Sequence, residues 1–338
     1  MHRPGRSSIT LAVLIPALLF PADAPRATRS AAAAPAARSS APEPTFASTW
    51  QDGRAELAGY HYRVIRYGEA RTGQAVMITV TEPFSESKRV KSDDPSKDPA
   101  DTFEALKMNL VRDFQTGIYD YNTMTSVFVR SRDFSPVKIS FSSAEWCGHV
   151  YEELRFDRAA VGQLLRSYFE DETGERTLPW RRDGIAEDQL MILVRGLRGA
   201  YLRPGEKRTL PLLPSSIARR LAHRPLAWVS ATVERAAKPE RVTVPAGVFQ
   251  SDRYDVTTSD ARKGTTWVER AAPHRILRWA WTSTAAGDRR ASEATESAEL
   301  AGSARLPYWQ LHANGQETYL KSLGLEPLPS PGPTTRRR

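Results

Sequence analysis

The chain has 338 residues, a formal net charge of +9, one cysteine and eight tryptophans. Its positive charge lies mainly at the two ends, because residues 1–48 carry a net +3 and the last ten residues another +3. The body between them keeps only +3, with basic and acidic residues alternating. A domain that binds nucleic acid concentrates Lys and Arg on one element, so the charge pattern argues against a nucleic-acid partner.

The first 24 residues have the order of a secretory signal peptide. The basic segment Met1–Arg6 precedes an apolar run of 12 residues, Ile9–Phe20, and then the small residues Ala22 and Ala24. A helix that crosses a bilayer needs about 20 apolar residues. We therefore expect a signal peptide over residues 1–24, a periplasmic or secreted protein, and no transmembrane segment in its mature form.

Two further segments have compositions that cannot form a packed core. Residues 25–48 are rich in Ala, Pro, Ser and Arg, which predicts a disordered linker. Residues 326–338 are rich in Pro and end in three arginines, which predicts a disordered basic tail. The single Cys147 cannot form an internal disulfide, so the body must be stable through packing alone.

Residues 49–156 have the pattern of a β-rich half. Tyr60, Tyr62 and Val64 alternate with polar residues, and Glu69–Gly73 supplies a turn before a second β-branched run, so this segment predicts a hairpin. Further strands are expected at Phe103–Phe114, Tyr119–Val129, Val137–Phe141 and His149–Phe156.

Residues 157–222 predict a helical connection. Val161, Leu164, Leu165, Tyr168 and Phe169 have helical spacing behind Asp157, a residue type that caps helices. Residues 186–198 suit a second helix or a buried strand, and residues 215–221 suit one more helical turn.

Residues 223–325 predict a second β-rich half. Strands are expected at Trp228–Arg235, Arg241–Val244, Val248–Thr257, Thr265–Arg270 and Arg275–Thr282. Residues 289–300 suit a polar edge strand, and residues 308–323 a docking segment or final helix. Short connections favour antiparallel pairing. The predicted fold class is mainly β with a few helices: a curved antiparallel sheet or open β-barrel, formed as one large domain or as two β-rich halves joined by the helical segment.

Part of the second half resembles a known group of proteins. The residues are Val244-Pro245-Ala246-Gly247-Val248-Phe249, Tyr254, Thr266-Trp267-Val268-Glu269 and Pro273-His274-Arg275-Ile276-Leu277. This cadence resembles bacterial exported proteins of unknown function whose fold is similar to the open β-barrels of periplasmic lipoprotein carriers. The resemblance covers the last third of the body. It implies a curved sheet that shelters an apolar ligand, and it implies no catalytic residues.

The one local arrangement typical of catalysis is Cys147 close to His149, because an imidazole can activate a thiol. In a regular strand the two side chains share a face at about 7 Å, beyond hydrogen-bond reach. A bulge at Gly148 would bring them together. A packed, inert thiol is the other interpretation. Metal ligands with recognisable spacing are lacking, so we expect no metal and no cofactor.

Four tryptophans are candidates for ligand binding: Trp146, Trp267, Trp279 and Trp281. Large rings on alternating strand positions usually fill cores, and they also line concave grooves. The leading hypothesis is a non-enzymatic exported protein that binds an apolar or envelope-derived ligand on a curved sheet, its partner a lipid, a glycan or an envelope protein. The alternatives are a thiol-dependent hydrolase or transferase using Cys147 and His149, and a structural or partner-binding envelope component.

Overall fold

The protein is represented by a computed structural model, in which the structure describes residues 44–284 and 294–327. Within these residues the fold is mainly β, with 16 strands in one sheet and a few short helices. The strand order runs β8-β7-β6-β5-β4-β3-β2-β1-β16-β15-β14-β13-β11-β10-β9, with β12 on β13, so the sheet is open between β8 and β9 and does not close into a barrel. The predicted fold class is confirmed.

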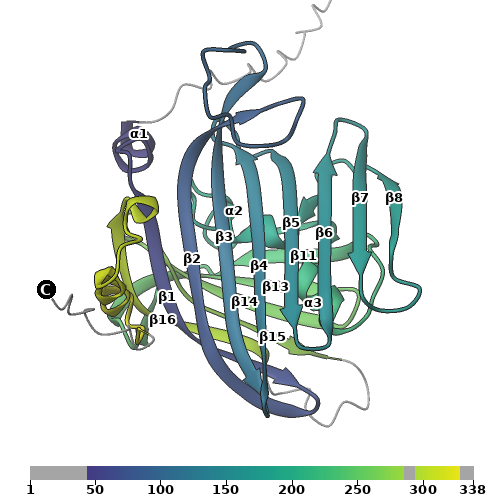
Figure 1. Cartoon of the computed structure of the whole chain (residues 1–338). Helices are drawn as coiled ribbons and strands as arrows, with labels where there is room; N and C mark the ends of the chain where they lie inside the picture. Colours follow the sequence, from purple (N-terminus) through teal and green to yellow (C-terminus); the bar gives the residue numbers. More distant parts are fainter. Residues whose placement is uncertain (1–43, 285–293, 328–338) are drawn as a thin grey trace, which may run out of the picture. The chain divides into compact units, whose positions relative to one another are not determined.

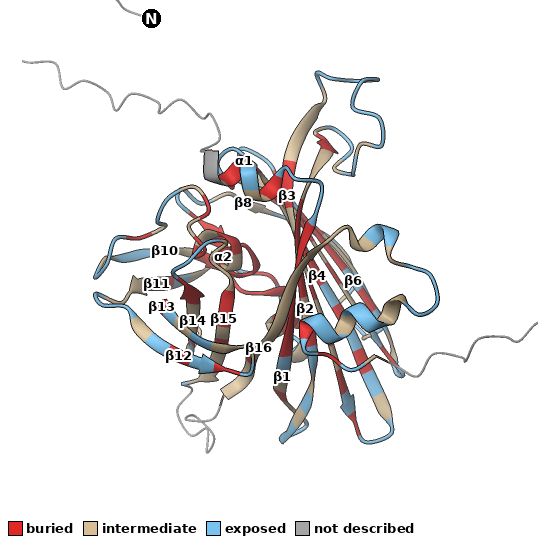
Figure 2. Ribbon diagram, turned by 90° about the vertical axis from the view of Figure 1, so that its left-hand side faces the viewer, coloured by how far each residue is buried: buried red, intermediate tan, exposed pale blue. Residues whose placement is uncertain are grey.

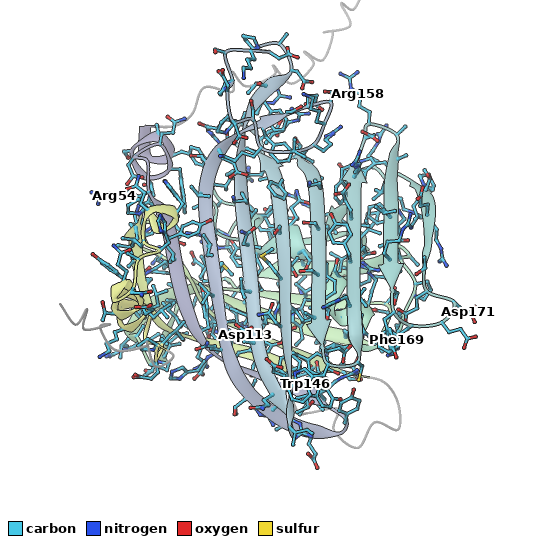
Figure 3. The ribbon with its side chains drawn as sticks, viewed as in Figure 1. Arg54, Asp113, Trp146, Arg158, Phe169 and Asp171 are labelled. Atoms are coloured by element: carbon cyan, nitrogen blue, oxygen red, sulfur yellow. The ribbon has the colours of Figure 1, made fainter. Side chains whose placement is uncertain are left out.

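The first eight strands form an antiparallel meander, which we call the N-terminal wing (Figure 1). They are β1 (Ala55–Arg66), β2 (Glu69–Ser85), β3 (Thr102–Thr116), β4 (Tyr119–Arg130), β5 (Pro136–Glu145), β6 (Gly148–Phe156), β7 (Ala160–Ser167) and β8 (Gly174–Pro179). Trp146 and Phe169 mark the turns after β5 and β7 at one end of this wing (Figure 3). The expected alternation holds in β1, where Tyr60, Tyr62 and Val64 are buried and His61 is exposed.

The other strands form the C-terminal wing. They are β9 (Ile185–Ala186), β10 (Lys207–Leu213), β11 (Val229–Arg235), β12 (Glu240–Val244), β13 (Gly247–Thr258), β14 (Arg262–Glu269), β15 (Ile276–Ser283) and β16 (Ala294–Leu306). Residues 289–300 were expected to form an edge strand, and residues 289–293 lie outside the described residues. The described remainder belongs to β16, which pairs with β1 on one side and β15 on the other. The edge-strand prediction is therefore wrong, and β16 joins the two wings.

The helical connection predicted for residues 157–222 is mostly wrong. Helices cover only α2 (Glu187–Leu193) and α3 (Ser216–Leu221), and the segment also contains β7, β8, β9 and β10. Residues 161–167 pair with β6 and β8, so their backbone groups are satisfied by strand ladders. Val161 and Gln163 are buried on one face, whereas Tyr168 is 64% exposed. The helical spacing of the apolar residues was coincidental, because only some of them face the core.

The predicted signal peptide, most of the predicted linker and nearly all of the predicted tail lie outside the described residues. The end of the linker prediction is wrong, because α1 (Pro44–Trp50) begins within it. Phe46 is 1% exposed and its ring is tilted against that of Phe134, with ring centroids 6.1 Å apart. Trp50 is also buried and lies under the guanidinium groups of Arg195 and Arg305. Burial of two large rings stabilises this helix against its ordering entropy.

Residues 308–323 form two 3-10 helices, η1 (Tyr308–Gln310) and η2 (Gln316–Leu323). The segment around η2 packs on the β1–β16 pair, where Gly59 and Gly302 lie opposite each other. A Cβ atom at Gly59 would lie 2.2 Å from the carbonyl oxygen of Leu323. Only glycine permits this close approach, so residues 308–323 dock on the sheet, with η2 as the helical part of the segment.

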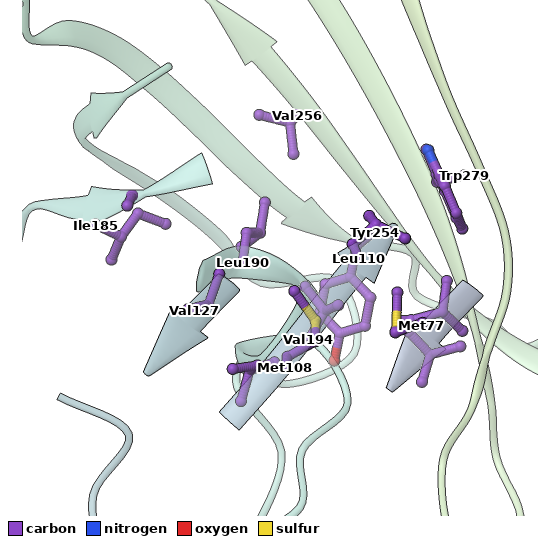
Figure 4. Close-up of a cluster of buried hydrophobic side chains, with 14 of the residues drawn as sticks. Met77, Met108, Leu110, Val127, Ile185, Leu190, Val194, Tyr254, Val256 and Trp279 are labelled. Carbon is purple, nitrogen blue, oxygen red and sulfur yellow. The ribbon is translucent and has the colours of Figure 1, made fainter. Parts of the chain in front are cut away.

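The two wings face each other across one hydrophobic core. In Figures 1 and 2 the strands β2 to β6 lie on one side and β11, β13, β14 and β15 on the other, with α2 between them. Met108 and Leu110 come from the N-terminal wing, and Val256 and Trp279 from the C-terminal wing (Figure 4). Leu190 of α2 is 5% exposed and belongs to the same cluster. The helix therefore fills the space between the wings.

Candidate ligand-binding site

The concave face of the sheet is packed where α2 covers it. Trp279 is fully buried, its ring centroid lies 4.8 Å from that of Tyr60, and its indole N–H donates to Glu296 at 3.2 Å. Arg112 donates to the same Glu296 carboxylate at 3.0 Å. Burying an ion pair is tolerated when further hydrogen bonds satisfy it, as here. Trp279 is thus a core residue, and the cavity of about 30 Å³ that it lines is small beside the space that a lipid or glycan needs.

The first turn of α2 joins this packed centre to α3. Glu187 accepts hydrogen bonds from Arg262 at 2.8 and 3.2 Å and from the backbone N–H of Ser215 at 3.2 Å. Asp188 accepts one from the backbone N–H of Ser216 at 3.0 Å. Burial raises the pKa of Asp188 to about 6, although the Ser216 N–H opposes that shift. Two adjacent acids therefore fix the start of α3.

An open cavity of about 450 Å³ lies beside α3, and we call it the α3 cavity. Its apolar wall is built from both wings and from the α3 segment: Val64, Ile65, Pro214, Ala218, Leu221, Ala222, Pro225, Ala227, Val229, Ala261 and Trp281. Its polar groups are Glu187, Arg219, Arg224, Asp260, Arg262, Ser283, Thr295 and Glu296. A concave surface of this size on which apolar residues outnumber polar ones is typical of small-molecule sites.

A second cavity of about 280 Å³ has a different lining, and we call it the arginine cavity. Its charged and ring-nitrogen side chains are Glu152, Asp171, Glu172, Arg176, Arg219, Arg220, His223 and Arg224. Arg219 donates to Glu152 at 2.5 Å, and Arg220 donates to Glu145. All four of these paired side chains are at most 6% exposed. The β6 and β5 carboxylates thereby hold the two α3 arginines in place.

The β7–β8 turn covers the arginine cavity. The ring of Phe169 lies 4.1 Å from the guanidinium carbon of Arg220 and its centroid 5.0 Å from that of His223. Glu172 contacts His223 at 2.6 Å and accepts from Ser167 at 2.5 Å. Burial raises the pKa of Glu172, but the hydrogen bonds from Ser167 and His223 outweigh it and hold the pKa below its usual value. The turn is therefore fastened to the segment after α3.

The two predicted catalytic candidates lie away from these cavities. Cys147 and His149 are both exposed at the β5–β6 turn, and neither lines the cavities described above. Gly148 between them has a φ of 158°, which is extended backbone. No hydrogen bond joins the thiol and the imidazole within the described part of the chain. The bulge that would bring them together is absent there, because β5 and β6 pair in register up to Glu145 and Gly148.

The four tryptophan candidates fall into different environments. Trp146 is 68% exposed in the β5–β6 turn, 6.4 Å from the Tyr119 ring. Trp267 donates to Glu240 and lies under the guanidinium group of Arg278, outside both cavities. Trp281 alone among the four lines the α3 cavity. The structure therefore does not bring the four tryptophans together in one groove.

Gly264 gives Trp281 its position. It lies opposite Trp281 in the β14–β15 ladder, and a Cβ atom there would come within 2.8 Å of the indole ring. The ring therefore lies flat over the glycine. The guanidinium carbon of Arg262 lies 4.9 Å from the ring centroid, which adds a cation–π contact.

Sequence reasoning missed the charged residues of the site. Glu152 and Glu153 of β6 point to opposite faces of the sheet: Glu152 binds Arg219, whereas Glu153 binds Arg155 at 2.6 Å. No role was predicted for the adjacent Arg219 and Arg220 of α3, although two neighbouring arginines before an apolar residue are unusual in a buried helix. Their partners lie 67 and 75 residues away, so local spacing could not reveal them.

Comparison with known proteins gives no family assignment. No family model matches the chain, and no curated protein matches it. No helix within residues 44–284 and 294–327 is long and apolar enough to span a membrane. The same residues contain no cluster of His, Cys, Asp and Glu suited to a metal ion.

Two solved structures are similar in part. One is a β-barrel-like protein of the domain of unknown function DUF1849 from Brucella abortus, with 10% identity, a TM-score of 0.45, and coverage of 74% of this chain and 97% of that one. The other is a candidate exported protein with a YmcC-like fold from Bacteroides fragilis, with 10% identity, a TM-score of 0.21, and coverage of 74% and 95%. At these scores the likenesses carry no argument about function, and neither is described as a lipoprotein carrier.

Proposed function

We propose that the protein is an exported, non-enzymatic binding protein that holds the apolar part of an envelope-derived ligand in the α3 cavity. The observation that carries this proposal is the cavity itself, an open space of about 450 Å³ with an apolar wall contributed by β1, β11, β15 and α3. Both wings leave apolar surface uncovered in this cavity. An apolar ligand that covers the surface removes it from water, which lowers the free energy of the complex.

The packing around the cavity supports a preformed site. Glu187 and Asp188 fix the start of α3, Arg219 and Arg220 fix its end through Glu152 and Glu145, and Arg66 donates to the backbone carbonyl of Leu221 at 3.1 Å. Because the site is already ordered, the protein loses little conformational entropy when a ligand binds, so burial of a modest apolar area suffices for measurable affinity.

Titration of the full chain with N-phenyl-1-naphthylamine tests the proposal, because this neutral dye fluoresces when it enters an apolar site. The blocking variant is Ala222→Trp, since Ala222 lines the cavity but is itself exposed and does not carry the core. The matched control is Ala144→Trp, an exposed position on β5 outside the cavities.

We expect saturable dye binding that Ala222→Trp weakens at least about tenfold and Ala144→Trp leaves unchanged, because a fully buried aromatic ring contributes well over 1.4 kcal/mol. Absence of saturable binding by the wild-type chain, or equal weakening by both variants, would contradict the proposal.

A further inference from the structure

The α3 cavity and the arginine cavity are neighbours. Arg219, Arg224 and Pro225 line both, so the two spaces border the same short stretch of chain. Eleven of the 19 residues that line the α3 cavity are apolar, against five of the 15 that line the arginine cavity, and three arginines and three acids line the first, four arginines and three acids the second. A ligand with an apolar part and a charged part matches this division.

The acids of the arginine cavity are largely occupied. Glu152 accepts hydrogen bonds from Arg219 and Gln163, and Glu172 is held by His223 and Ser167. Asp171 is exposed on the β7–β8 turn. Glu152 and Glu172 therefore contact Arg219 and His223, whereas Arg220 pairs with Glu145 and Arg224 with Asp260, two acids outside the lining of this cavity.

Arg220 is the group with unused donors. It is 7% exposed, and only its Nη2 pairs with a carboxylate, that of Glu145. Its Nε and Nη1 have no hydrogen-bond partner in the part of the chain that the structure describes. Buried donors without acceptors are costly, which makes such atoms rare in folded proteins. The Phe169 ring lies over this guanidinium group, and its low polarity strengthens the attraction of the guanidinium for an anion.

We infer that the ligand is an anionic amphiphile, with its alkyl chain in the α3 cavity and its carboxylate or phosphate group in the arginine cavity at Arg220. The inference rests on the proposed function, because it assigns the charged end of the ligand whose apolar end that proposal places. Arg176 and Arg224 are exposed at the same cavity and add positive charge for the approaching anion.

Displacement of N-phenyl-1-naphthylamine from the full chain compares three ligands with the same alkyl chain: dodecanoate, dodecyl phosphate and 1-dodecanol. Dodecanol measures the apolar contribution alone. We expect at least one of the two anions to displace the dye at a concentration at least about tenfold below that of dodecanol, because a charge-assisted hydrogen bond in a dry site is worth at least that factor. The tighter anion identifies the head group, a fatty acid or a phosphate ester.

Arg220→Lys tests the named residue. Lysine keeps the positive charge beside Glu145 but lacks Nε and the planar fork that meets an oxyanion. We expect it to lower the affinity for the preferred anion at least about fivefold and to leave the dodecanol affinity unchanged. The matched control is Arg166→Lys, whose arginine pairs with Glu175 at 2.8 Å outside both cavities. If Arg220→Lys unfolds, the double variant Glu145→Gln/Arg220→Gln replaces it, because it leaves no unpaired buried charge.

The outcomes separate the two proposals. Binding of dodecanol and both anions with equal affinity overturns the anionic ligand but supports the apolar site. An anion preference that survives the Arg220 variants overturns the role of Arg220. Failure of all three ligands to displace the dye, or of the dye to bind, overturns the proposed function itself.

Discussion

The two short helices between the wings, α2 and α3, have opposite surroundings. Around α2 the wings meet, and Leu190 and Ile192 are at most 5% exposed within the shared core. Around α3 the same wings leave a cavity of about 450 Å³, although α3 is tied down at both ends. Polar contacts hold both helices, those of Glu187 to Arg262 and of Arg219 to Glu152 among them, but only α2 also packs large apolar side chains into the core between the wings. One helix therefore completes the core, and the other is held in place without filling the space beside it.

The comparison is tested most strongly by the same substitution in each helix. We expect Leu190→Ala to lower the free energy of unfolding by about 2–5 kcal/mol, because it opens a void in a packed core. Leu221→Ala should cost below about 1 kcal/mol, because Leu221 is half-buried and already borders open space. Urea unfolding of both variants gives the two values. Equal losses would show that α3 is packed as tightly as α2.

Asp188 is the acid at which the two helices meet, and its pKa predicts a pH dependence. Its pKa of about 6 in the fold lies above the ordinary value of 3.8, so the folded state holds this proton more tightly than the unfolded state. The contribution of Asp188 to stability is thus lost as pH rises from about 4 to about 6. Asp188→Asn keeps an acceptor for the Ser216 N–H and removes the titration.

The stability difference between Asp188→Asn and the wild type should therefore shift in favour of the variant by up to about 3 kcal/mol between pH 4 and pH 7. Urea unfolding at several pH values measures it. A difference that stays constant with pH would show that the fold does not raise the pKa of Asp188, and the account of the α2–α3 junction would be wrong.

Gly264 allows a smaller test of the open side. A methyl group there meets the Trp281 ring at 2.8 Å, so Gly264→Ala must push the ring toward the α3 cavity. We expect a stability loss of about 1 kcal/mol and severalfold weaker dye binding. Gly162→Ala is the matched control, because a Cβ atom at Gly162 of β7 meets nothing within 4 Å. If Gly264→Ala bound the dye as the wild type does, Trp281 would not be part of the dye-binding site.

The smallest effect is expected at the β7–β8 turn. Glu172→Gln removes the contact with His223, and since both side chains are partly exposed the loss should be below about 1 kcal/mol at pH 7. The lowered pKa of Glu172 means that its contribution is present above its unfolded pKa and is lost as pH falls through the folded value. The variant and the wild type should therefore converge in strong acid. Glu175→Gln, in an exposed pair with Arg166, is the control.

Sequence patterns predicted the strands well and the site poorly. Alternation alone located β1 through Tyr60, Tyr62 and Val64, because those side chains face the core at every second position. It failed at residues 161–169, where the outer part of the sheet leaves apolar residues such as Tyr168 exposed and a helical spacing arises by chance. The joining role of β16 was also missed, because its polar sequence hides a central position in the sheet.

The site was missed for a related physical reason. Its charged residues are meaningful only in pairs, and Glu187 meets Arg262 across 75 residues of sequence. Two of the tryptophans predicted to bind a ligand have structural contacts instead: Trp279 fills the core, and Trp267 contacts Glu240 and Arg278. Trp281 alone of the four predicted rings borders the α3 cavity, and its place depends on Gly264, a neighbour that no periodicity indicates.

Crystals of the full chain grown with 12-bromododecanoate test the central claim most directly, because bromine is located by its anomalous scattering. The account predicts a bromine peak inside the α3 cavity beside Trp281, with the carboxylate on the Arg220 side of α3. A peak on the outer face of the sheet, or no ordered bromine in crystals that hold the ligand, would contradict it.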